Sequence, residues 1–474
     1  MTYLTRRHII AGLAATAAAP FARAARAQDA SEIAATTRVI EVKGKAATVF
    51  GLESRQGFVF DAAQDLRLAL TNRLNEPTLI HWHGQTPPSD QDGVPMLSQP
   101  ALEPGGRYAY DFRPRPGTHW MHSHVGLQEQ KLLAAPMILR DKDELAADIQ
   151  EHVVLLHDFT FRDPQEILAE LKRGGGDHAA HAGGTAGDMS GMDHGKMAMP
   201  EPAAMLNDVR FDAFLANDRT LDDPEILRAE TGGRVRLRII NGAAASNMWV
   251  DLGSLDAELI AVDGNAVMPV RDRLFPLAVA QRIDLVIQLP RENGAWPVLF
   301  RPEGTAERTG LVIATGDGQI AKVAAEGEPA PALDLALELK LRASKSLRPE
   351  PVTRTEMLML TGGGADYVWG LNGKPSLVHE TLFAVRLGER IAVMMHNMTQ
   401  MSHPMHLHGH HFQVVDIDGQ RIAGALRDTV LVPPKAAVTI AFDADNPGNW
   451  AFHCHHLYHM NAGMMGAVAY VNAA

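Results

Sequence analysis

Residues 447–464 read Pro-Gly-Asn-Trp-Ala-Phe-His-Cys-His-His-Leu-Tyr-His-Met-Asn-Ala-Gly-Met, and this stretch decides how the rest of the chain is interpreted. Cys454 is the only cysteine among 474 residues, and it lies between His453 and His455. The residues before it predict a turn followed by a strand, and successive side chains of a strand point to opposite faces. We therefore expect the two histidines to face one way and the cysteine the other, so that one short segment can bind metal on both of its sides.

Three apolar segments that each end in asparagine mark an internal repeat. They are residues 66–72, 235–241 and 391–397. The asparagines that end them are 169 and then 156 residues apart, which indicates three copies of one domain. Nine residues after the asparagine, the first and third copies have His-x-His-Gly, at 81–84 and 406–409, whereas the middle copy has Val250.

A second repeated element carries the remaining paired histidines. A proline–glycine pair precedes His122-Ser123-His124 by the same distance at which another precedes His453-Cys454-His455. In the middle copy, the residues at the same distance after Gly294 are Leu299-Phe300-Arg301. The first and third copies therefore carry histidine pairs that the middle copy has lost. We expect the outer domains to build one site together, with the middle domain as a spacer.

Short apolar segments separated by turns are spread over the whole chain, which contains 41 glycines and 28 prolines. This pattern predicts an all-β fold. We place the domains at residues 28–150, 151–330 and 340–474. One short helix is expected from Asp163 to about Lys172, because aspartate followed by proline is a helix-start signal.

The N-terminus has the pattern of an export signal. Arg6 and Arg7 precede a short apolar run, and Ala25-Arg26-Ala27 is a small-x-small cleavage site. We interpret residues 1–27 as a twin-arginine signal peptide and expect a periplasmic protein; an ordinary secretory signal is the alternative. Because the chain has a single cysteine, it can form no internal disulfide in that compartment, so Cys454 needs another explanation.

The charge balance and the hydropathy exclude two kinds of partner. The formal net charge is −12, and removing the four arginines of residues 1–27, a segment with no acid, makes it −16. A chain this acidic is not expected to bind nucleic acid. No later segment is apolar over the roughly 20 residues that a membrane span needs, so no membrane insertion is expected.

Four His-x-His pairs supply eight imidazoles, a ligand type suited to copper, zinc, iron and nickel. They are His81, His83, His122, His124, His406, His408, His453 and His455. His403, Cys454 and His459 add a His₂Cys set, and Met464 follows. Two imidazoles, one thiolate and a weak axial thioether describe a blue-copper electron-transfer site. A buried apolar role for Cys454 is the alternative, which the surrounding histidines disfavour.

In this order and spacing, over essentially the whole chain after the signal, these motifs resemble the four copper signatures of the multicopper oxidases, the laccase-like enzymes. The resemblance implies three cupredoxin-like Greek-key β-barrel domains and four copper ions. The type 1 copper would take His403, Cys454, His459 and, axially, Met464. The type 2 copper would take His81 and His406. The type 3 pair would take His83, His122, His124, His408, His453 and His455.

The resemblance also implies the reaction. Single electrons from a substrate would enter at the type 1 copper and pass through Cys454 to the three-copper cluster, where four of them reduce O₂ to water. Asp92 matches an acid that family members place near the cluster as a proton source; a turn aspartate before Gly93 is the alternative. Some bacterial relatives have an acid directly after the second type 1 histidine, where this chain has Met460, so a proton relay through that position is absent.

The sequence leaves the electron donor open. Residues 174–205 form a low-complexity segment rich in methionine and histidine, and thioethers favour Cu(I), although a drifted linker is the alternative. Together with local motifs similar to those of periplasmic copper-resistance oxidases, this predicts a cuprous oxidase in copper tolerance. A broad laccase for phenols or aromatic amines is the second hypothesis, and a non-enzymatic copper-sequestering protein is the third. A monomer is expected, because three domains in one chain can close the cluster.

Two further features bear on the substrate. Five methionines crowd the approach to His403, and core filling is the alternative role for them. They are Met394, Met395, Met398, Met401 and Met405. Asp428, in Arg427-Asp428-Thr429-Val430, resembles a laccase turn and is expected to face substrate.

Overall fold

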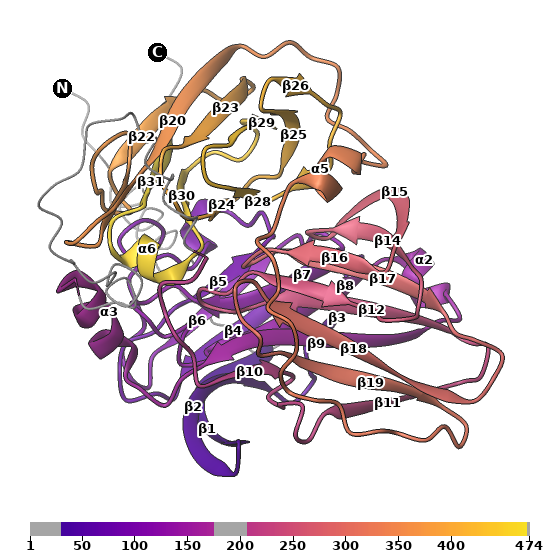
Figure 1. The fold of residues 1–474 in the computed structure, drawn as a ribbon. Helices are drawn as coiled ribbons and strands as arrows, with labels where there is room; N and C mark the ends of the chain where they lie inside the picture. The colour runs from indigo at the N-terminus through magenta and orange to yellow at the C-terminus, as the bar shows by residue number, and fades with distance from the viewer. Residues whose placement is uncertain (1–29, 175–205, 472–474) are drawn as a thin grey trace, which may run out of the picture.

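The computed structural model describes residues 30–174 and 206–471. The signal predicted over residues 1–27 and nearly all of the segment 174–205 therefore lie outside the described residues. The described residues are mainly strands, which form six sheets that follow one another along the chain as three pairs (Figure 1). The predicted all-β fold is confirmed. Within the described residues, no helix is long and apolar enough to span a membrane.

The elements follow one another in three groups of strands. The first sheet pair contains β1 (Ser31–Val42), β2 (Lys45–Ser54), β3 (Val59–Asp61), β4 (Leu66–Asn72), β5 (Ile80–His83), β6 (Arg107–Phe112), β7 (Gly117–Ser123) and β8 (Ala134–Arg140). The second contains β9 (Gln150–Phe159), β10 (Ala213–Ala216), β11 (Glu225–Ala229), β12 (Arg234–Asn241), β13 (Met248–Asp251), β14 (Ala257–Val262), β15 (Asn265–Asp272), β16 (Leu274–Leu277), β17 (Arg282–Gln288), β18 (Gly294–Pro302) and β19 (Thr309–Thr315). The third contains β20 (Arg354–Gly363), β21 (Val368–Leu371), β22 (Thr381–Val385), β23 (Arg390–Asn397), β24 (His403–Leu407), β25 (Phe412–Ile417), β26 (Gln420–Arg421), β27 (Leu426–Arg427), β28 (Thr429–Val432), β29 (Ala437–Asp443), β30 (Asn449–Cys454) and β31 (Met465–Tyr470). The helices are short: η1 (Ser89–Gln91), α2 (Lys142–Ala146), α3 (Pro164–Lys172), α5 (Ala336–Lys340) and α6 (Leu457–Asn461).

The same strand arrangement recurs in the three sheet pairs. The repeated strands that end in asparagine are β4, β12 and β23. Each has a parallel neighbour that precedes it in the chain, namely β1, β9 and β20, respectively. The strands β3, β11 and β22 lie parallel to β8, β19 and β31 in the other sheet of each pair. Parallel neighbours cannot be joined by a tight hairpin, so the chain crosses between the two sheets of a pair. The internal repeat seen in the sequence is thus a repeat of topology.

The asparagine that ends each repeated strand is fully buried and closes the loop that follows it. The side-chain oxygens of Asn72, Asn241 and Asn397 each accept a hydrogen bond from the backbone N–H two residues later. Each side-chain amide also donates to two backbone carbonyls, one in the same loop and one further along the chain. A buried amide with these partners is satisfied. The loop that leads into each histidine strand, or into its counterpart, therefore requires asparagine.

The histidine motifs lie opposite one another on antiparallel strands. The opposed residues are His81 and His122 in the first sheet pair, His406 and His453 in the third, and Val250 and Phe300 in the second. The offset from Gly294 predicted Leu299 at the histidine position, and the strand pairing shows that this prediction is wrong by one residue. The strand β18 has one more residue between Gly294 and the paired position than β7 has after Gly117. Apolar side chains fill the middle pair where the outer pairs have imidazoles.

Two short helices bear on the site. The helix α3 begins at Pro164, and the carboxylate of Asp163 caps it by accepting a hydrogen bond from the Gln165 N–H at 2.7 Å, so the predicted helix is confirmed. The helix α6 begins three residues after Cys454 and carries His459. The helix reverses the direction of the chain and thereby places His459 next to Cys454.

Candidate metal centres

The eight paired histidines are buried, and they come together from the first and third sheet pairs. Their ring nitrogens form groups in which all ligand atoms lie within 4.8 Å of one another. The groups are His81, His83 and His406; His83, His122 and His455; and His124, His408 and His453. Every group combines side chains from both outer sheet pairs. The first and third parts of the chain thus build one cluster together.

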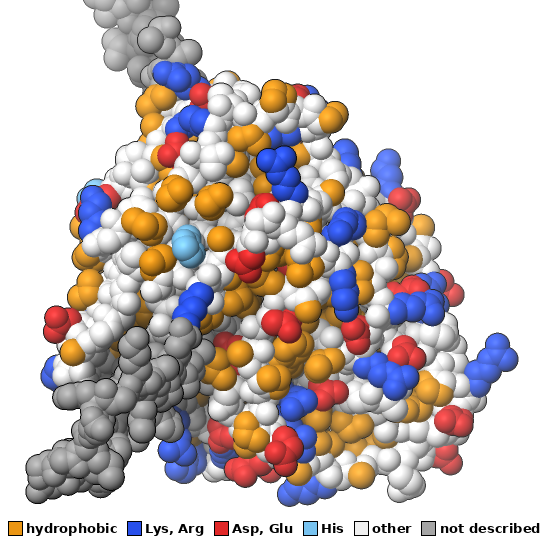
Figure 2. All heavy atoms as spheres, turned by 45° about the horizontal axis from the view of Figure 1, so that its top comes forward, with side chains coloured by type: hydrophobic (Ala, Val, Ile, Leu, Met, Phe, Trp, Pro, Cys, Tyr) orange, Lys and Arg blue, Asp and Glu red, His pale blue; other side chains and the backbone are white. Residues whose placement is uncertain are grey.

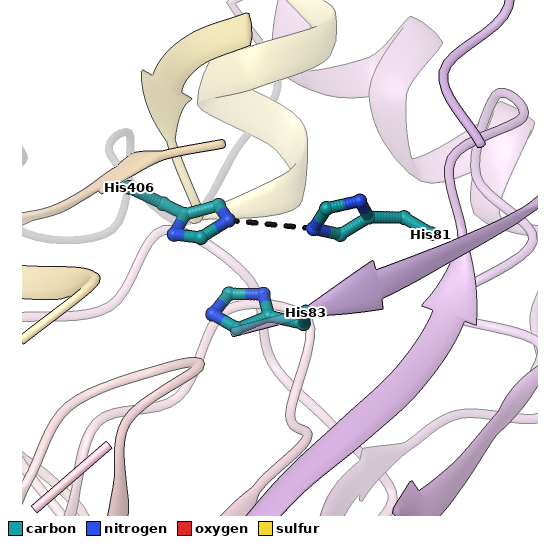
Figure 3. Close-up of side chains that lie close together, drawn as sticks. All are labelled: His81, His83 and His406. Carbon is teal, nitrogen blue, oxygen red and sulfur yellow. Dashed lines mark hydrogen bonds between the residues drawn. The ribbon is translucent and has the colours of Figure 1, made fainter. Parts of the chain in front are cut away.

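His81 and His406 approach each other from the two sheet pairs, with His83 beside them (Figure 3). Nδ1 of His81 donates to the carbonyl oxygen of Asp92 at 2.9 Å, and Nδ1 of His406 donates to that of Asp428 at 2.8 Å. Each Nε2 therefore carries a lone pair, and the two Nε2 atoms are 3.5 Å apart. Two nitrogens bound to one metal at about 2.0 Å and a tetrahedral angle would be about 3.3 Å apart. The pair fits a metal ion.

His453 brings a second set of lone pairs together. Its Nε2 lies 3.3 Å from Nε2 of His124 and 2.9 Å from Nε2 of His408. Nδ1 of His453 donates to the Cys454 carbonyl at 2.9 Å, and Nδ1 of His408 donates to the Asp92 carboxylate at 2.8 Å. Burial lowers the pKa of His453 to about 4, which keeps the ring in the neutral form that binds metals.

The third histidine group contains nitrogens without hydrogen-bond partners. His83 uses Nε2 to contact the carboxylate of Asp428 at 3.0 Å and the hydroxyl of Thr429 at 3.2 Å. Its Nδ1, and the Nε2 atoms of His122 and His455, are buried and have no hydrogen-bond partner in the described part of the chain. Unpartnered buried nitrogens are costly, and a metal ion shared by the three would satisfy them.

Cys454 forms a separate group with His403 and His459. The two imidazole Nδ1 atoms are 3.2 Å apart, and they lie 3.6 and 3.9 Å from the Cys454 Sγ. Their Nε2 atoms have other partners, the Thr399 hydroxyl at 2.8 Å and the Asp208 carboxylate at 3.1 Å. Burial raises the pKa of the Cys454 thiol, so a thiolate here requires a neighbouring cation such as a metal ion.

Met464 and an aromatic ring complete the surroundings of this group. Met464 is fully buried, and its carbonyl oxygen accepts a hydrogen bond from the Cys454 N–H at 3.0 Å. The indole of Trp369 stacks on the His459 ring with centroids 3.9 Å apart and excludes water from it. The strand alternation expected around Cys454 is present: its thiol belongs to one group, while His453 and His455 belong to the two groups on the other side.

The first sheet pair has a hydrogen-bonded triad at the positions equivalent to those of the Cys454 group. Thr78 lies three residues before His81, as His403 lies three residues before His406. Ser123 and Gln128 follow His122 by one and six residues, as Cys454 and His459 follow His453. Both hydroxyls donate to the side-chain oxygen of Gln128 at 2.7 Å. Hydroxyl and amide groups that satisfy one another leave no soft donor there. At these equivalent positions, the third copy offers a thiol to a metal and the first copy does not.

Asp92 lies beside the cluster, as the sequence predicts, and also in a turn. It is fully buried, ends η1 and precedes Gly93, which has φ +83°. Its carboxylate contacts Nδ1 of His408 at 2.8 Å and Nδ1 of His81 at 3.2 Å. These are the outer nitrogens, so Asp92 orients two rings from outside the cluster.

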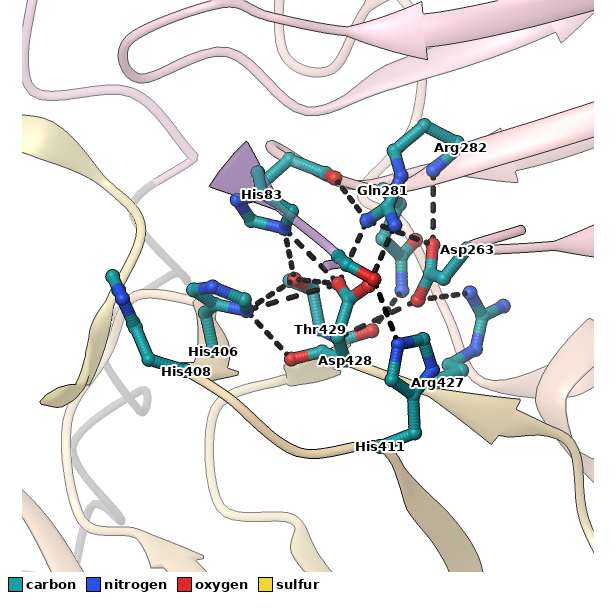
Figure 4. Close-up of polar contacts among 12 residues, drawn as sticks. His83, Asp263, Gln281, Arg282, His406, His408, His411, Arg427, Asp428 and Thr429 are labelled. Atoms are coloured by element: carbon teal, nitrogen blue, oxygen red, sulfur yellow. Dashed lines mark hydrogen bonds and ion pairs between the residues drawn. The ribbon is translucent and has the colours of Figure 1, made fainter. Parts of the chain in front are cut away.

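Asp428 does not face substrate, and that expectation is wrong. It is fully buried, and its carboxylate pairs with Arg282 of β17 at 2.5 and 2.7 Å, while also contacting His83 (Figure 4). Arg282 holds the pKa of Asp428 below its usual range in spite of burial. The middle part of the chain is therefore more than a spacer, because its arginine fixes the acid that orients a ring of the cluster.

The structure adds two acids that sequence reasoning missed. Glu129 is buried between two rings of the cluster, with Oε2 2.8 Å from Nδ1 of His122 and Oε1 3.8 Å from Nδ1 of His455. Burial raises the pKa of Glu129 well above its usual range, and the charge of Asp158 adds to this. Its segment, Gly-Leu-Gln-Glu-Gln-Lys, is typical of an exposed loop, so no local signal marked it.

Asp208 is the second acid, and it lies beside the Cys454 group. Its carboxylate contacts Nε2 of His459 and Nε2 of His456, each at 3.1 Å, and accepts a hydrogen bond from the Tyr367 hydroxyl. The two histidines hold the pKa of Asp208 below its usual range although burial opposes this. Asp208 also lines a cavity of about 470 Å³ with Arg162 and Phe211.

The five methionines near His403 divide into two sets. Met395, Met401 and Met405 are buried in the core, as the alternative interpretation holds. Met394 is half-buried, whereas 59% of Met398 is exposed. The methionines therefore do not form one approach to His403.

A fold built mainly of strands, with a thiol–imidazole group next to an eight-imidazole cluster, fits the class of copper-binding proteins. Comparison with known families agrees with this class. Family models described as multicopper oxidase match residues 55–144, 150–316 and 349–474. The multicopper oxidase MmcO of Mycobacterium tuberculosis is 32% identical over 418 residues, which is 86% of this chain and 79% of that protein. The chain belongs to the multicopper oxidase family, whose members are copper-containing oxidoreductases.

Further relatives and solved structures are consistent with this family. Copper resistance protein A of Escherichia coli is 28% identical over 525 residues, covering 85% of this chain and 86% of that protein. A multi-copper oxidase from Pseudomonas thermotolerans superposes with a TM-score of 0.70 at 23% identity, covering 93% of this chain and 98% of the other. The laccase from Botrytis aclada gives a TM-score of 0.74 at 21% identity, covering 93% and 87%. At these identities the two structures establish the fold, three cupredoxin-like units.

Proposed function

We propose that this enzyme couples one-electron oxidation at a type 1 copper to four-electron reduction of O₂ to water at a three-copper cluster. One observation carries the proposal: Cys454 contributes its thiol to one group, while its two neighbours contribute imidazoles to the other groups. The carbonyl of Cys454 also accepts the hydrogen bond of His453 Nδ1 at 2.9 Å. Two short routes, one covalent and one through this bond, thus join the centres.

Four coppers would be distributed over the groups of ligand atoms. The type 1 copper would take His403, Cys454, His459 and axial Met464. The type 2 copper would take Nε2 of His81 and of His406. The type 3 pair would take His83 Nδ1 with Nε2 of His122 and His455 for one ion, and Nε2 of His124, His408 and His453 for the other. Metal analysis of the purified enzyme tests the number, with four equivalents expected.

The bound coppers supply the redox chemistry, and the chain's own residues prepare the site for it. Burial of the imidazoles excludes water, and it lowers the pKa of His83, His122 and His455, which favours their neutral form. Asp92, Asp428 and Glu129 lie at the outer nitrogens, where they fix the orientation of the rings. Proton supply by Asp92 stays a prediction. It is tested by Asp92→Asn, which should slow O₂ reduction while leaving the blue absorption of the type 1 centre unchanged.

The electron donor that we propose is Cu(I), in a role in copper tolerance. Relatives named copper resistance protein A support this, as do the thioether-rich segments of the chain. Oxidation of phenols is the second candidate. A cavity of about 470 Å³ supports it, because its lining includes Asp208, and the buried carboxylate of Asp208 contacts His459 at 3.1 Å.

Steady-state O₂ consumption with Cu(I) and with a phenol separates the two candidates. A cuprous oxidase should show the higher kcat/KM with Cu(I), and the reverse ranking would favour the laccase. Deletion of residues 174–205 adds a second comparison. If that segment supplies copper, Cu(I) oxidation should fall while phenol oxidation is kept; unchanged Cu(I) kinetics would remove the segment from the proposal.

We also propose export by a twin-arginine signal to the periplasm, and a monomeric enzyme. Arg6 and Arg7 support the export route. Replacing both by lysine should keep the enzyme in the cytoplasm, and unaltered export would argue for an ordinary secretory signal. Light scattering should give the mass of one chain, since all ligand groups are complete within it.

A further inference from the structure

Methionine is exposed to an unusual degree on one face of the third sheet pair. On β20, 65% of Met357 and 40% of Met359 is exposed, while the intervening Leu358 is buried. Just after β23, 59% of Met398 is exposed. Methionine is normally among the most buried residue types, so three exposed methionines on neighbouring segments need an explanation. Figure 2 looks toward this end of the molecule and shows hydrophobic side chains spread over it, with a histidine among them.

The register of the two strands places further donors beside these methionines. The strands β20 and β23 are parallel neighbours, with Met357 opposite Met394 and Met359 opposite His396. Directly opposed residues point to the same face of a sheet, and this one is the outer face, because His396 is exposed and Met394 half-exposed. We call Met357, Met359, Met394, His396 and Met398 the methionine face.

The spacing suits a small ion. Neighbouring strands are about 4.8 Å apart, and alternate residues along a strand are about 6.6 Å apart. Methionine has three rotatable bonds, so several sulfurs can converge on one ion between the strands. The backbone beneath is held in place, since the side-chain oxygen of Asn372 accepts from the Met359 N–H at 2.9 Å and the Met398 N–H donates to Leu360 at 2.9 Å.

We propose that the methionine face is a surface binding site for Cu(I). Thioethers are soft ligands that select Cu(I), and imidazole binds copper in either state. An apolar docking patch would not need sulfur, and it would gain nothing from His396 in its centre. The proposal rests on the proposed cuprous oxidase function, for which it names the place where the substrate is collected.

The methionine face has a short connection to the type 1 ligands. Met398 is followed by Thr399, whose hydroxyl lies 2.8 Å from Nε2 of His403. Nδ1 of the same ring faces the Cys454 thiol at 3.6 Å. A Cu(I) ion on the face would lose one electron through this path to a copper held by His403 and Cys454, and would leave as Cu(II). Four such ions, with four protons, balance the reduction of one O₂ to two waters.

The test replaces the donors and keeps their bulk. We compare the copper-loaded full-length enzyme with the variant Met357→Leu/Met359→Leu/His396→Gln, which retains the apolar area but loses three ligands. The control is Met96→Leu/Met268→Leu, in which Met96 is 67% exposed in the loop between η1 and β6, and Met268 is 59% exposed on β15. Calorimetric titration with Ag(I), a soft monovalent ion, counts sites without turnover. All five substituted side chains lie at the surface, so folding should be unaffected.

The donor variant should bind one Ag(I) fewer than the wild type and the control. Its KM for Cu(I) should rise about tenfold or more, with kcat/KM for a phenol unchanged. Equal Ag(I) stoichiometry in all three proteins would overturn the site, whatever the oxidase activity. If the wild type oxidises phenols but not Cu(I), the cuprous oxidase function fails. A missing Ag(I) equivalent would then show a soft-metal site that does not feed the enzyme, which overturns its role as the place of substrate collection.

Discussion

The replacement of Arg282 by methionine should destabilise the protein from a position outside the metal ligands. Arg282 is fully buried in β17 and forms two hydrogen bonds with Asp428, at 2.5 and 2.7 Å. Its Nε also donates to the Thr118 carbonyl at 3.2 Å. The pair therefore joins all three sheet pairs directly behind His83. Methionine fits the space approximately but leaves the carboxylate of Asp428 buried without its cation.

The expected magnitude follows from the burial. Removing one partner of a buried ion pair costs about 3–5 kcal/mol, because the other charge stays desolvated. For units of 150–250 residues, each kcal/mol lowers Tm by about 2–4 °C, so the variant should melt at least about 6 °C below the wild type. In the wild type, Arg282 lowers the pKa of Asp428, so this contribution is present above about pH 4 and is lost only at lower pH. Without Arg282, burial raises that pKa, and the deficit should grow with increasing pH.

Thermal melting followed by circular dichroism, at several pH values and for the metal-free protein, measures this effect. Arg271→Met is the matched control: the Arg271 side chain is 79% exposed in its pair with Glu258, and its loss should cost less than about 1 kcal/mol. The double variant Arg282→Met/Asp428→Asn should regain part of the loss, because the unpaired charge is gone. Melting of Arg282→Met within about 2 °C of the wild type, or no recovery in the double variant, would refute the reasoning.

Three further predictions concern other parts of the molecule. Cys454→Ser should abolish both the blue absorption and oxidase turnover while keeping the far-ultraviolet dichroism, and a variant that stays blue would contradict the type 1 assignment. Burial raises the pKa of Glu303 to about 7, so its ionisation should lower stability as pH rises from about 4.5 through 7; in Glu303→Gln, a matched series of melting curves should lack this slope, and an identical slope would exclude Glu303 as its cause. A Cβ at Gly93 would lie 1.9 Å from the carbonyl oxygen of Ile80, next to His81, so Gly93→Ala should yield little folded protein or a protein with less copper; normal yield and copper content would show that the strand can shift.

Local sequence patterns were sufficient for the strands and for the histidine pairs that lie on them. The segments that end in Asn72, Asn241 and Asn397 form β4, β12 and β23, because apolar alternation and a loop-closing amide act within a few residues. The offset between asparagine and histidine is likewise local. The offset counted from Gly294 placed Leu299 at the histidine position, and this was wrong by one residue. The strand β18 holds an extra residue that only strand pairing reveals.

The partners of the ligands could not be predicted in this way. Glu129 and Asp208 touch His122 and His459 from loops that carry no motif. The error over Asp428 has the same origin, since its partner Arg282 lies 146 residues away in another sheet pair. Contacts between distant segments depend on how whole sheets pack, and side-chain type alone does not specify them.

The sequence by itself determined that one short strand presents His453 and Cys454 to opposite sides, because alternation along a strand is a property of the backbone. It also determined that two of three repeats retain histidines. Only the tertiary structure decided which ring nitrogen is available in each group, since that depends on the carbonyl or carboxylate at the other nitrogen. It also decided that the methionines of β20 and β23 meet at the surface, because their positions, 35 or more residues apart in sequence, become neighbours only through strand pairing.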